Sequence, residues 1–172
     1  MRPPLPKEYP AYYGNYIKLV ATNDIIKLLD EQVVDIQELI SNVDEDKENF
    51  AYEPGKWTIK EVVGHIIDTE RILAYRALRF ARKDNTALAG FDENNYVANA
   101  NFGKRTLYNL SHEFALLRES NIVLFKYFDE EMLNQSGIAN DNEASVRSLL
   151  YMIAGHAAHH VNILKTRYLV GE

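Results

Sequence analysis

The chain contains no cysteine among its 172 residues. This absence excludes disulfide bridges, thiolate zinc sites and a cysteine nucleophile. Any metal ion would have to be held by nitrogen and oxygen ligands.

The chain also lacks an excess of positive charge and a long apolar run. Nineteen lysine and arginine residues face 25 aspartate and glutamate residues, which gives a formal net charge of −6. A nucleic-acid backbone or an anionic membrane surface therefore has no basic patch to bind. No stretch approaches the roughly 20 apolar residues of a membrane span, and the N-terminus has no signal-peptide core. We expect a cytoplasmic protein that binds neither nucleic acid nor membrane.

Proline is scarce and unevenly distributed. Four of the five prolines lie in the first 20 residues, together with four tyrosines. They predict an extended N-terminal arm over residues 1–20 rather than a helix. The total length suits a single domain, residues 1–172.

Four segments carry apolar residues at helical spacing, and strand-like alternation never extends beyond a few residues. The second segment opens with a capping box, in which Thr58 and Glu61 satisfy each other's backbone N–H groups. The segments run from a cap at Thr22 or Asn23 to about Ser41, from Thr58 to about Arg82, from about Leu107 to Phe128, and from a cap at Ser145 to about Leu169. The pattern predicts an all-α four-helix bundle.

The connection between the second and third helices, residues 83–106, is longer than compact domains usually have. Fully extended, it could return along a whole helix. We therefore expect these two helices to run parallel, in an up-down-down-up order. Long connections are often functional, so Phe91, Tyr96 and Phe102 are expected to wall a substrate pocket.

Three of the five histidines carry the functional signal. His156 and His160 are one helical turn apart, on a seam that Ile153 and Ile163 continue. One buried histidine is usually a hydrogen-bonded core residue, but two side by side each need a partner. A shared metal ion would satisfy both, and His65 in the second helix is the best candidate for a third ligand.

Better-known metal signatures are not met, so a site would be mononuclear. His112-Glu113 has Leu116 where an H-E-x-x-H motif needs its second histidine, and the paired Glu-x-x-His segments of di-iron proteins are missing.

Two further residues are candidates for proton transfer. Glu70 falls on the apolar face of the second helix, where a buried carboxylate must be paired, protonated or functional. His159 lies at the edge of the histidine seam, where a partly exposed surface ring is the alternative. The expected pocket also includes Thr69, one turn after His65, and Asn121, a polar residue that interrupts the apolar spacing of the third helix.

Two signatures taken together resemble a known family. The segment from Tyr52 to Glu70, with Pro-Gly-Lys-Trp-Thr and His65, resembles the opening of the DinB/YfiT-like family, and His156-Ala157-Ala158-His159-His160 is similar to its second signature. The resemblance covers roughly residues 32–169. It implies a four-helix bundle that binds a divalent metal, typically zinc or nickel, through His65, His156 and His160. Relatives often continue with Arg-Gly-Gln, where this chain has Val-Asn-Ile.

The resemblance implies a metal-dependent hydrolase, or a transferase or isomerase that uses a low-molecular-weight thiol. An ion with an open position could activate water or bind a small thiol. The expected partner is a small-molecule substrate. The expected metal is zinc, with nickel as the alternative. A homodimer is possible. The competing hypothesis is a non-catalytic, metal-stabilised bundle that acts as a binding or stress-response module.

Overall fold

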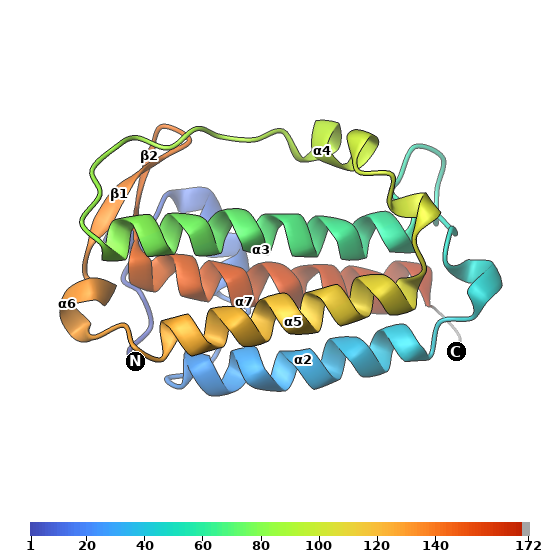
Figure 1. The fold of residues 1–172 in the computed structure, drawn as a ribbon, viewed down its shortest axis with the longest axis horizontal. Coiled ribbons are helices and arrows are strands. Elements are labelled where there is room, and N and C mark those ends of the chain that lie inside the picture. The colour runs from blue at the N-terminus through green and yellow to red at the C-terminus, as the bar shows by residue number, and fades with distance from the viewer. Residues whose placement is uncertain (170–172) are drawn as a thin grey trace.

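Four long helices form a bundle in the computed structural model, which describes residues 1–169 (Figure 1). They are α2 (Ile25–Ser41), α3 (Ile59–Ala81), α5 (Leu107–Phe125) and α7 (Val146–Ile163). The shorter elements are η1 (Pro6–Glu8), η2 (Ala11–Tyr13), α1 (Gly14–Ile17), η3 (Glu45–Lys47), α4 (Glu93–Asn99), η4 (Phe102–Lys104), α6 (Glu130–Leu133), β1 (Ser136–Ala139), β2 (Asn142–Ser145) and the π-helical turn η5 (Leu164–Tyr168). The predicted all-α four-helix bundle is confirmed.

Each long helix begins at a side-chain cap, which accepts a hydrogen bond from a backbone N–H three residues further on. These caps are Asp24, Thr58, Thr106 and Ser145. The capping box of Thr58 and Glu61 is present as predicted. The cap of α2 is Asp24 rather than Thr22 or Asn23, because the Thr22 hydroxyl instead accepts from the Asp24 N–H at 2.9 Å.

The N-terminal segment is not extended throughout, since η1, η2 and α1 interrupt it. Proline is accepted in the first turn of a helix, where its missing N–H costs nothing, and η1 begins at Pro6. The segment lies directly on α7. A Cβ atom added at Gly155 would come within 2.3 Å of the Tyr16 carbonyl oxygen, and the Tyr151 hydroxyl donates to the Thr22 carbonyl at 2.8 Å.

Helices α3 and α5 begin at the same end of the bundle. The Glu48 carboxylate pairs with Lys60 at 2.7 Å near the start of α3, and accepts from the Leu107 N–H at 3.3 Å at the start of α5. Both helices therefore run in one direction, and the colours of Figure 1 show α2 and α7 running in the other. Residues 82–106 return along the bundle and include α4 and η4, two helical pieces that the sequence did not predict.

A two-stranded antiparallel hairpin precedes α7 and was also not predicted. Its turn residues Asn140 and Asp141 have φ values of 51° and 59°, which a two-residue turn of this kind requires and which Asn and Asp tolerate. The Leu88 N–H donates to the Ile138 carbonyl, and the Asn140 N–H donates to the Leu88 carbonyl. The hairpin thereby anchors the connection between α3 and α5.

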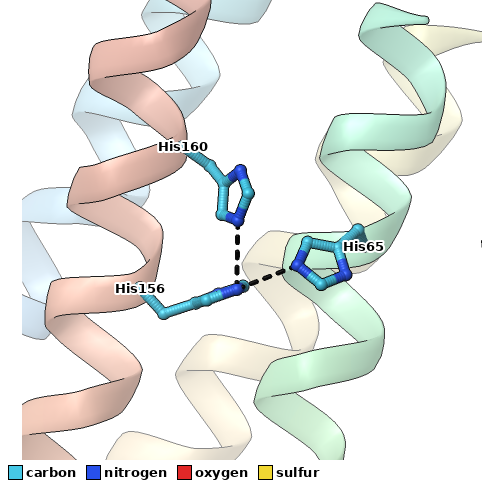
Figure 2. Close-up of side chains that lie close together, drawn as sticks. All are labelled: His65, His156 and His160. Carbon is cyan, nitrogen blue, oxygen red and sulfur yellow. Dashed lines mark hydrogen bonds between the residues drawn. The ribbon is translucent and has the colours of Figure 1, made fainter. Parts of the chain in front are cut away.

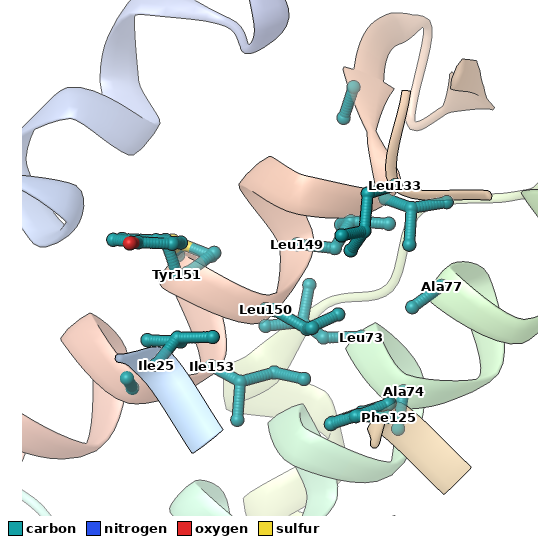
Figure 3. Packing of buried hydrophobic residues seen from close by; sticks show 14 of the residues in the cluster. Ile25, Leu73, Ala74, Ala77, Phe125, Leu133, Leu149, Leu150, Tyr151 and Ile153 are labelled. Carbon is teal, nitrogen blue, oxygen red and sulfur yellow. The ribbon is translucent and has the colours of Figure 1, made fainter. Parts of the chain in front are cut away.

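The core divides into two clusters of buried apolar side chains. One, shown in Figure 3, includes Ile25, Leu73, Phe125 and Leu149. The other lies toward the start of α3 and includes Ile59, Ile66, Leu110 and Phe114. No helix within residues 1–169 has both the length and the apolar character needed to cross a membrane.

A layer of buried polar side chains separates the two clusters. On each long helix, the residue that belongs to this layer lies between the residues of one cluster and those of the other. The layer includes Gln32 from α2, Glu70 from α3, Arg118 from α5 and His156 from α7. Polar groups in a core are stable only when they are partnered, so this layer is where a functional site is expected.

Candidate metal centre

The three predicted histidines meet where His156 of this polar layer adjoins the second apolar cluster (Figure 2). His65 comes from α3, and His156 and His160 come from α7. The Nε2 atoms of His65 and His156 are 2.9 Å apart, and those of His156 and His160 are 3.1 Å apart. One ligand atom from each ring lies within 4.8 Å of the other two, and all three residues are buried. The convergence expected from the sequence is present.

Glycine residues beside two of these histidines let neighbouring segments approach closely. A Cβ atom at Gly64 would come within 2.4 Å of the Phe102 ring, and one at Gly155 would meet the Tyr16 backbone. Phe102 and the N-terminal segment therefore pack directly on α3 and α7, next to His65 and His156. A larger residue at either glycine would push these neighbours away from the site.

Hydrogen bonding alone does not satisfy the three rings. A neutral imidazole nitrogen either donates one proton or accepts along one lone pair, yet Nε2 of His156 lies within 3.1 Å of two other nitrogens. One shared cation would accept all three lone pairs at once. Nitrogen atoms that each lie about 2.1 Å from one ion are about 3 Å apart when their bonds meet near a right angle. The two Nε2 separations of 2.9 and 3.1 Å match this geometry, and three imidazoles are a donor set that suits one divalent ion.

Burial keeps the three rings neutral at physiological pH. It lowers the pKa of His65 to about 4 and that of His160 to about 3. For His156, burial and then the neighbouring histidines hold the pKa well below 6.5. Metal ions bind the neutral imidazole, so the lone pairs are available without deprotonation.

The surroundings hold the His65 ring on two sides. The Thr69 hydroxyl lies 3.5 Å from Nδ1 of His65, which leaves Nε2 facing the other histidines. The Trp57 ring lies 4.7 Å from the His65 ring, and the Tyr16 ring lies 5.7 Å from that of His156. Partners of this kind fix the orientation of metal-binding rings.

A cavity of about 330 Å³ opens beside the triad. Its walls come from the N-terminal segment, α3, α7, the connection after α3 and the hairpin. Besides the three histidines, the lining residues include Tyr12, Tyr13, Tyr16, Trp57, Thr69, Leu73, Arg76, Phe91, Glu93, Asn140 and Met152.

Two of the five predicted pocket residues, Thr69 and Phe91, line this cavity. Tyr96 is 45% exposed and packs its ring 5.2 Å from that of Phe91. Phe102 is buried behind α3, because Gly64 leaves room for its ring there. Asn121 is buried too, and its side-chain amide donates to Glu70 at 3.1 Å. The pocket prediction is therefore corrected for Tyr96, Phe102 and Asn121.

Glu70 forms a buried ion pair and is not among the lining residues of the cavity. Its Oε1 accepts from Nε of Arg118 at 2.7 Å, and its Oε2 accepts from Nη2 at 2.8 Å. The pair explains why a carboxylate stands on an apolar helix face, because each charge neutralises the other. The structure corrects the proton-transfer prediction for Glu70, whose oxygens are occupied by Arg118 and Asn121.

His159 lies at the edge of the triad and is half-buried. Its ring centre is 5.1 Å from those of Tyr16 and His160. Burial lowers its pKa from the ordinary value. Its role in proton transfer stays a prediction.

Several cavity residues were missed by the sequence analysis, and Glu93 is the most informative. It stands in the first turn of α4, which Asp92 caps, and its negative charge opposes the lowering of the His65 pKa. The Asp92 cap was a readable helix signal. The position of α4 over α3 was not, because it depends on how residues 82–106 fold back.

Comparisons with known proteins agree with this architecture. Residues 28–164 match the sequence signature of the DinB superfamily. A protein of Oceanobacillus iheyensis, provisionally named a metal-dependent hydrolase, is 26% identical over 135 residues, which are 74% of each chain.

Two solved structures share the fold. YfiT from Bacillus subtilis, described in the same provisional terms and with an unusual four-helix bundle topology, superposes with a TM-score of 0.77 at 15% identity over 83% of each chain. A mycothiol-dependent maleylpyruvate isomerase superposes with a TM-score of 0.66 at 13% identity, over 84% of this chain and 61% of that one.

Proposed function

Because the chain belongs to the DinB superfamily, we propose that it is a divalent-metal-dependent enzyme with a mononuclear site on His65, His156 and His160. The observation that carries the proposal is the convergence of three buried, neutral imidazoles. The Nε2 atom of His156 lies 2.9 Å from that of His65 and 3.1 Å from that of His160. Zinc is the first expectation and nickel the alternative, since both accept imidazole ligands.

A divalent ion held by three histidines supplies a Lewis acid with an open coordination position. The chain's own residues contribute the rest. Thr69 and Trp57 fix the His65 ring, and the tyrosines of the N-terminal segment cover the cavity. Glu93 can accept a proton at a carboxylate oxygen on the cavity wall, with His159 as the second candidate.

The reaction is either hydrolysis or transfer to a small thiol. Hydrolysis is supported by the provisional names of the Oceanobacillus and Bacillus proteins. Thiol chemistry is supported by the fold shared with a mycothiol-dependent enzyme. The chain has no cysteine, so a thiol would enter the cavity as a second substrate.

The non-catalytic alternative is a metal-stabilised binding or stress-response module. A structural site is usually closed by four protein ligands. Within residues 1–169 the candidate cluster has three, and a cavity adjoins it. This arrangement favours an enzyme.

The test begins with metal analysis of protein purified without an affinity tag. We expect one zinc or nickel ion per chain, and cobalt-substituted protein whose visible spectrum changes when azide or a small thiol is added. The loaded protein is then assayed on a panel of esters and amides, with and without thiols, before and after chelation. If the site binds one ion per chain but the visible spectrum of the cobalt-loaded protein does not change with any added ligand, the non-catalytic module is supported.

A further inference from the structure

Arg76 is a buried cation on the wall of the cavity. It stands on α3 and is 5% exposed. Its Nη2 donates to the Ala89 carbonyl at 2.9 Å. Burial raises the pKa of the nearby Tyr13 hydroxyl, and the Arg76 guanidinium opposes that shift.

The Arg76 guanidinium has no negatively charged protein partner within ion-pairing distance in residues 1–169. The two fully buried arginines differ from Arg76, since Arg118 pairs with Glu70 and Arg147 pairs with Glu130. Burying an arginine without an anion is costly. A cavity-facing cation of this kind is suited to an anion that comes from outside.

Arg76 shares a helix face with the metal site. His65, Thr69, Leu73 and Arg76 follow one another at intervals of four, four and three residues, and all four line the cavity. His65 and Arg76 are therefore separated by about 16 Å along the α3 axis. The long Arg76 side chain leaves the helix toward its N-terminus, which is the direction of His65, and so shortens that gap. Because both residues line the same cavity, one small molecule can contact both.

We infer that Arg76 is a substrate-binding residue that pairs with a carboxylate, and that the substrate is a small organic acid whose reacting group lies at the three histidines. The inference rests on the proposed function, because it places the reacting group at the metal site. A guanidinium and a carboxylate match in charge and in two-point geometry.

A carboxylate fits the site better than a phosphate. One guanidinium balances one carboxylate charge, whereas phosphate usually gathers several donors at a helix N-terminus or a backbone nest. Inorganic phosphate therefore serves as the competing probe.

The experiment uses mercapto-carboxylic acids of increasing length, from 3-mercaptopropionate to 6-mercaptohexanoate, against mercapto-alcohols of equal length. Binding to the cobalt-loaded protein is followed by the thiolate-to-cobalt absorption. At the best length the acid should bind at least about tenfold tighter than the alcohol, as expected for a charge-assisted hydrogen bond. Arg76→Met should remove this preference and leave alcohol binding unchanged.

Two further variants keep the result interpretable. Arg76→Lys retains the charge, so it should keep part of the preference for the acid. It provides the test if Arg76→Met folds poorly. Arg71→Met removes an exposed arginine of the same helix that pairs with Glu113, and should change nothing. Equal binding of acid and alcohol at every length, or a preference that survives in Arg76→Met, would overturn the inference.

A metal-independent measurement separates this inference from the proposed function. Glutarate and inorganic phosphate are titrated calorimetrically into metal-free protein. Glutarate binding that depends on Arg76 supports the carboxylate site whether or not the protein binds cobalt. Failure to bind cobalt would refute the metal centre alone. Absence of such binding in protein that also fails to bind cobalt, or tighter binding of phosphate than of glutarate, would overturn it.

Discussion

Glu70 and Arg118 form a two-point ion pair in the centre of the bundle, with their side chains 2% and 0% exposed. Arg118 also donates through Nη1 to the Leu29 carbonyl and to the Gln32 side chain, and Gln32 donates to the Ala154 carbonyl. The network therefore joins all four long helices. Gln32 holds α7 at Ala154, two residues before His156, and Arg118 links Gln32 to Glu70 on α3. The network therefore connects the two helices that carry the histidines.

Removing one charge of this pair should be strongly destabilising. Arg118→Met leaves the Glu70 carboxylate buried without its cation, and we expect a loss of about 3–5 kcal/mol in the free energy of unfolding. Urea denaturation measures this. The double variant Glu70→Leu, Arg118→Met should recover much of the loss, because it leaves no orphaned charge. If the double variant is as unstable as the single one, the loss of stability does not come from the unpaired Glu70 charge.

His160→Ala should abolish stoichiometric metal binding while the bundle stays folded. The surrounding core remains in place, so we expect a cost of about 1–3 kcal/mol, including the lost stabilisation by the ion. Metal analysis and urea denaturation are measured together. His112→Ala, which removes an exposed histidine, is the matched control and should bind one ion. Global unfolding of His160→Ala would indicate a structural ion instead.

Acidification should destabilise the metal-free protein. The folded-state pKa values of His65 and His160, about 4 and about 3, lie below the ordinary value of 6.5. The unfolded chain therefore binds protons that the folded chain does not, and stability is full above pH 6.5 and falls as the pH decreases toward 4. Each histidine should contribute up to about 1.4 kcal/mol per pH unit in that window.

The pH dependence is measured by urea denaturation between pH 7.5 and 4. A variant with leucine at all three positions should show a shallower dependence, because those ionisations are removed. Equal slopes for the two proteins would contradict the assignment of neutral, buried histidines.

Gly155→Ala should detach the N-terminal segment from α7. The added Cβ would lie 2.3 Å from the Tyr16 carbonyl oxygen, and overpacking against backbone usually costs about 1–3 kcal/mol. Gly14→Ala is the matched control, since its Cβ would meet only Tyr9, at an ordinary 3.7 Å. Limited proteolysis after Lys18 should accelerate in the first variant and not in the second. Equal rates would show that the segment does not depend on this contact.

The sequence predicts the parts of this fold that depend on local spacing. Helical periodicity and capping side chains such as Thr58 and Ser145 locate the long helices, and the four-residue interval between His156 and His160 places both on one face. The partner of Glu70 was not predicted, because Arg118 is an arginine that looks solvent-exposed in sequence and becomes buried only by tertiary packing.

The cavity walls depend on contacts between distant segments. Glu93 reaches the cavity through a connection whose path is set by the Leu88 bridge to Ala139. The hairpin strands are only four residues each, too short to show clear alternation. Arg76 lies at a helical spacing from His65, but nothing local shows that it lacks an anionic partner.

X-ray absorption spectroscopy of the zinc- or nickel-loaded protein tests the metal centre most directly. It measures the number of imidazole ligands and their distances from the ion. We expect three imidazole nitrogens at about 2.0–2.1 Å together with at least one exchangeable light-atom ligand, and loss of one imidazole in His65→Ala, His156→Ala or His160→Ala if an ion is retained. An ion with one imidazole or none, or three variants whose spectra do not differ from that of the unsubstituted protein, would contradict the three-histidine site.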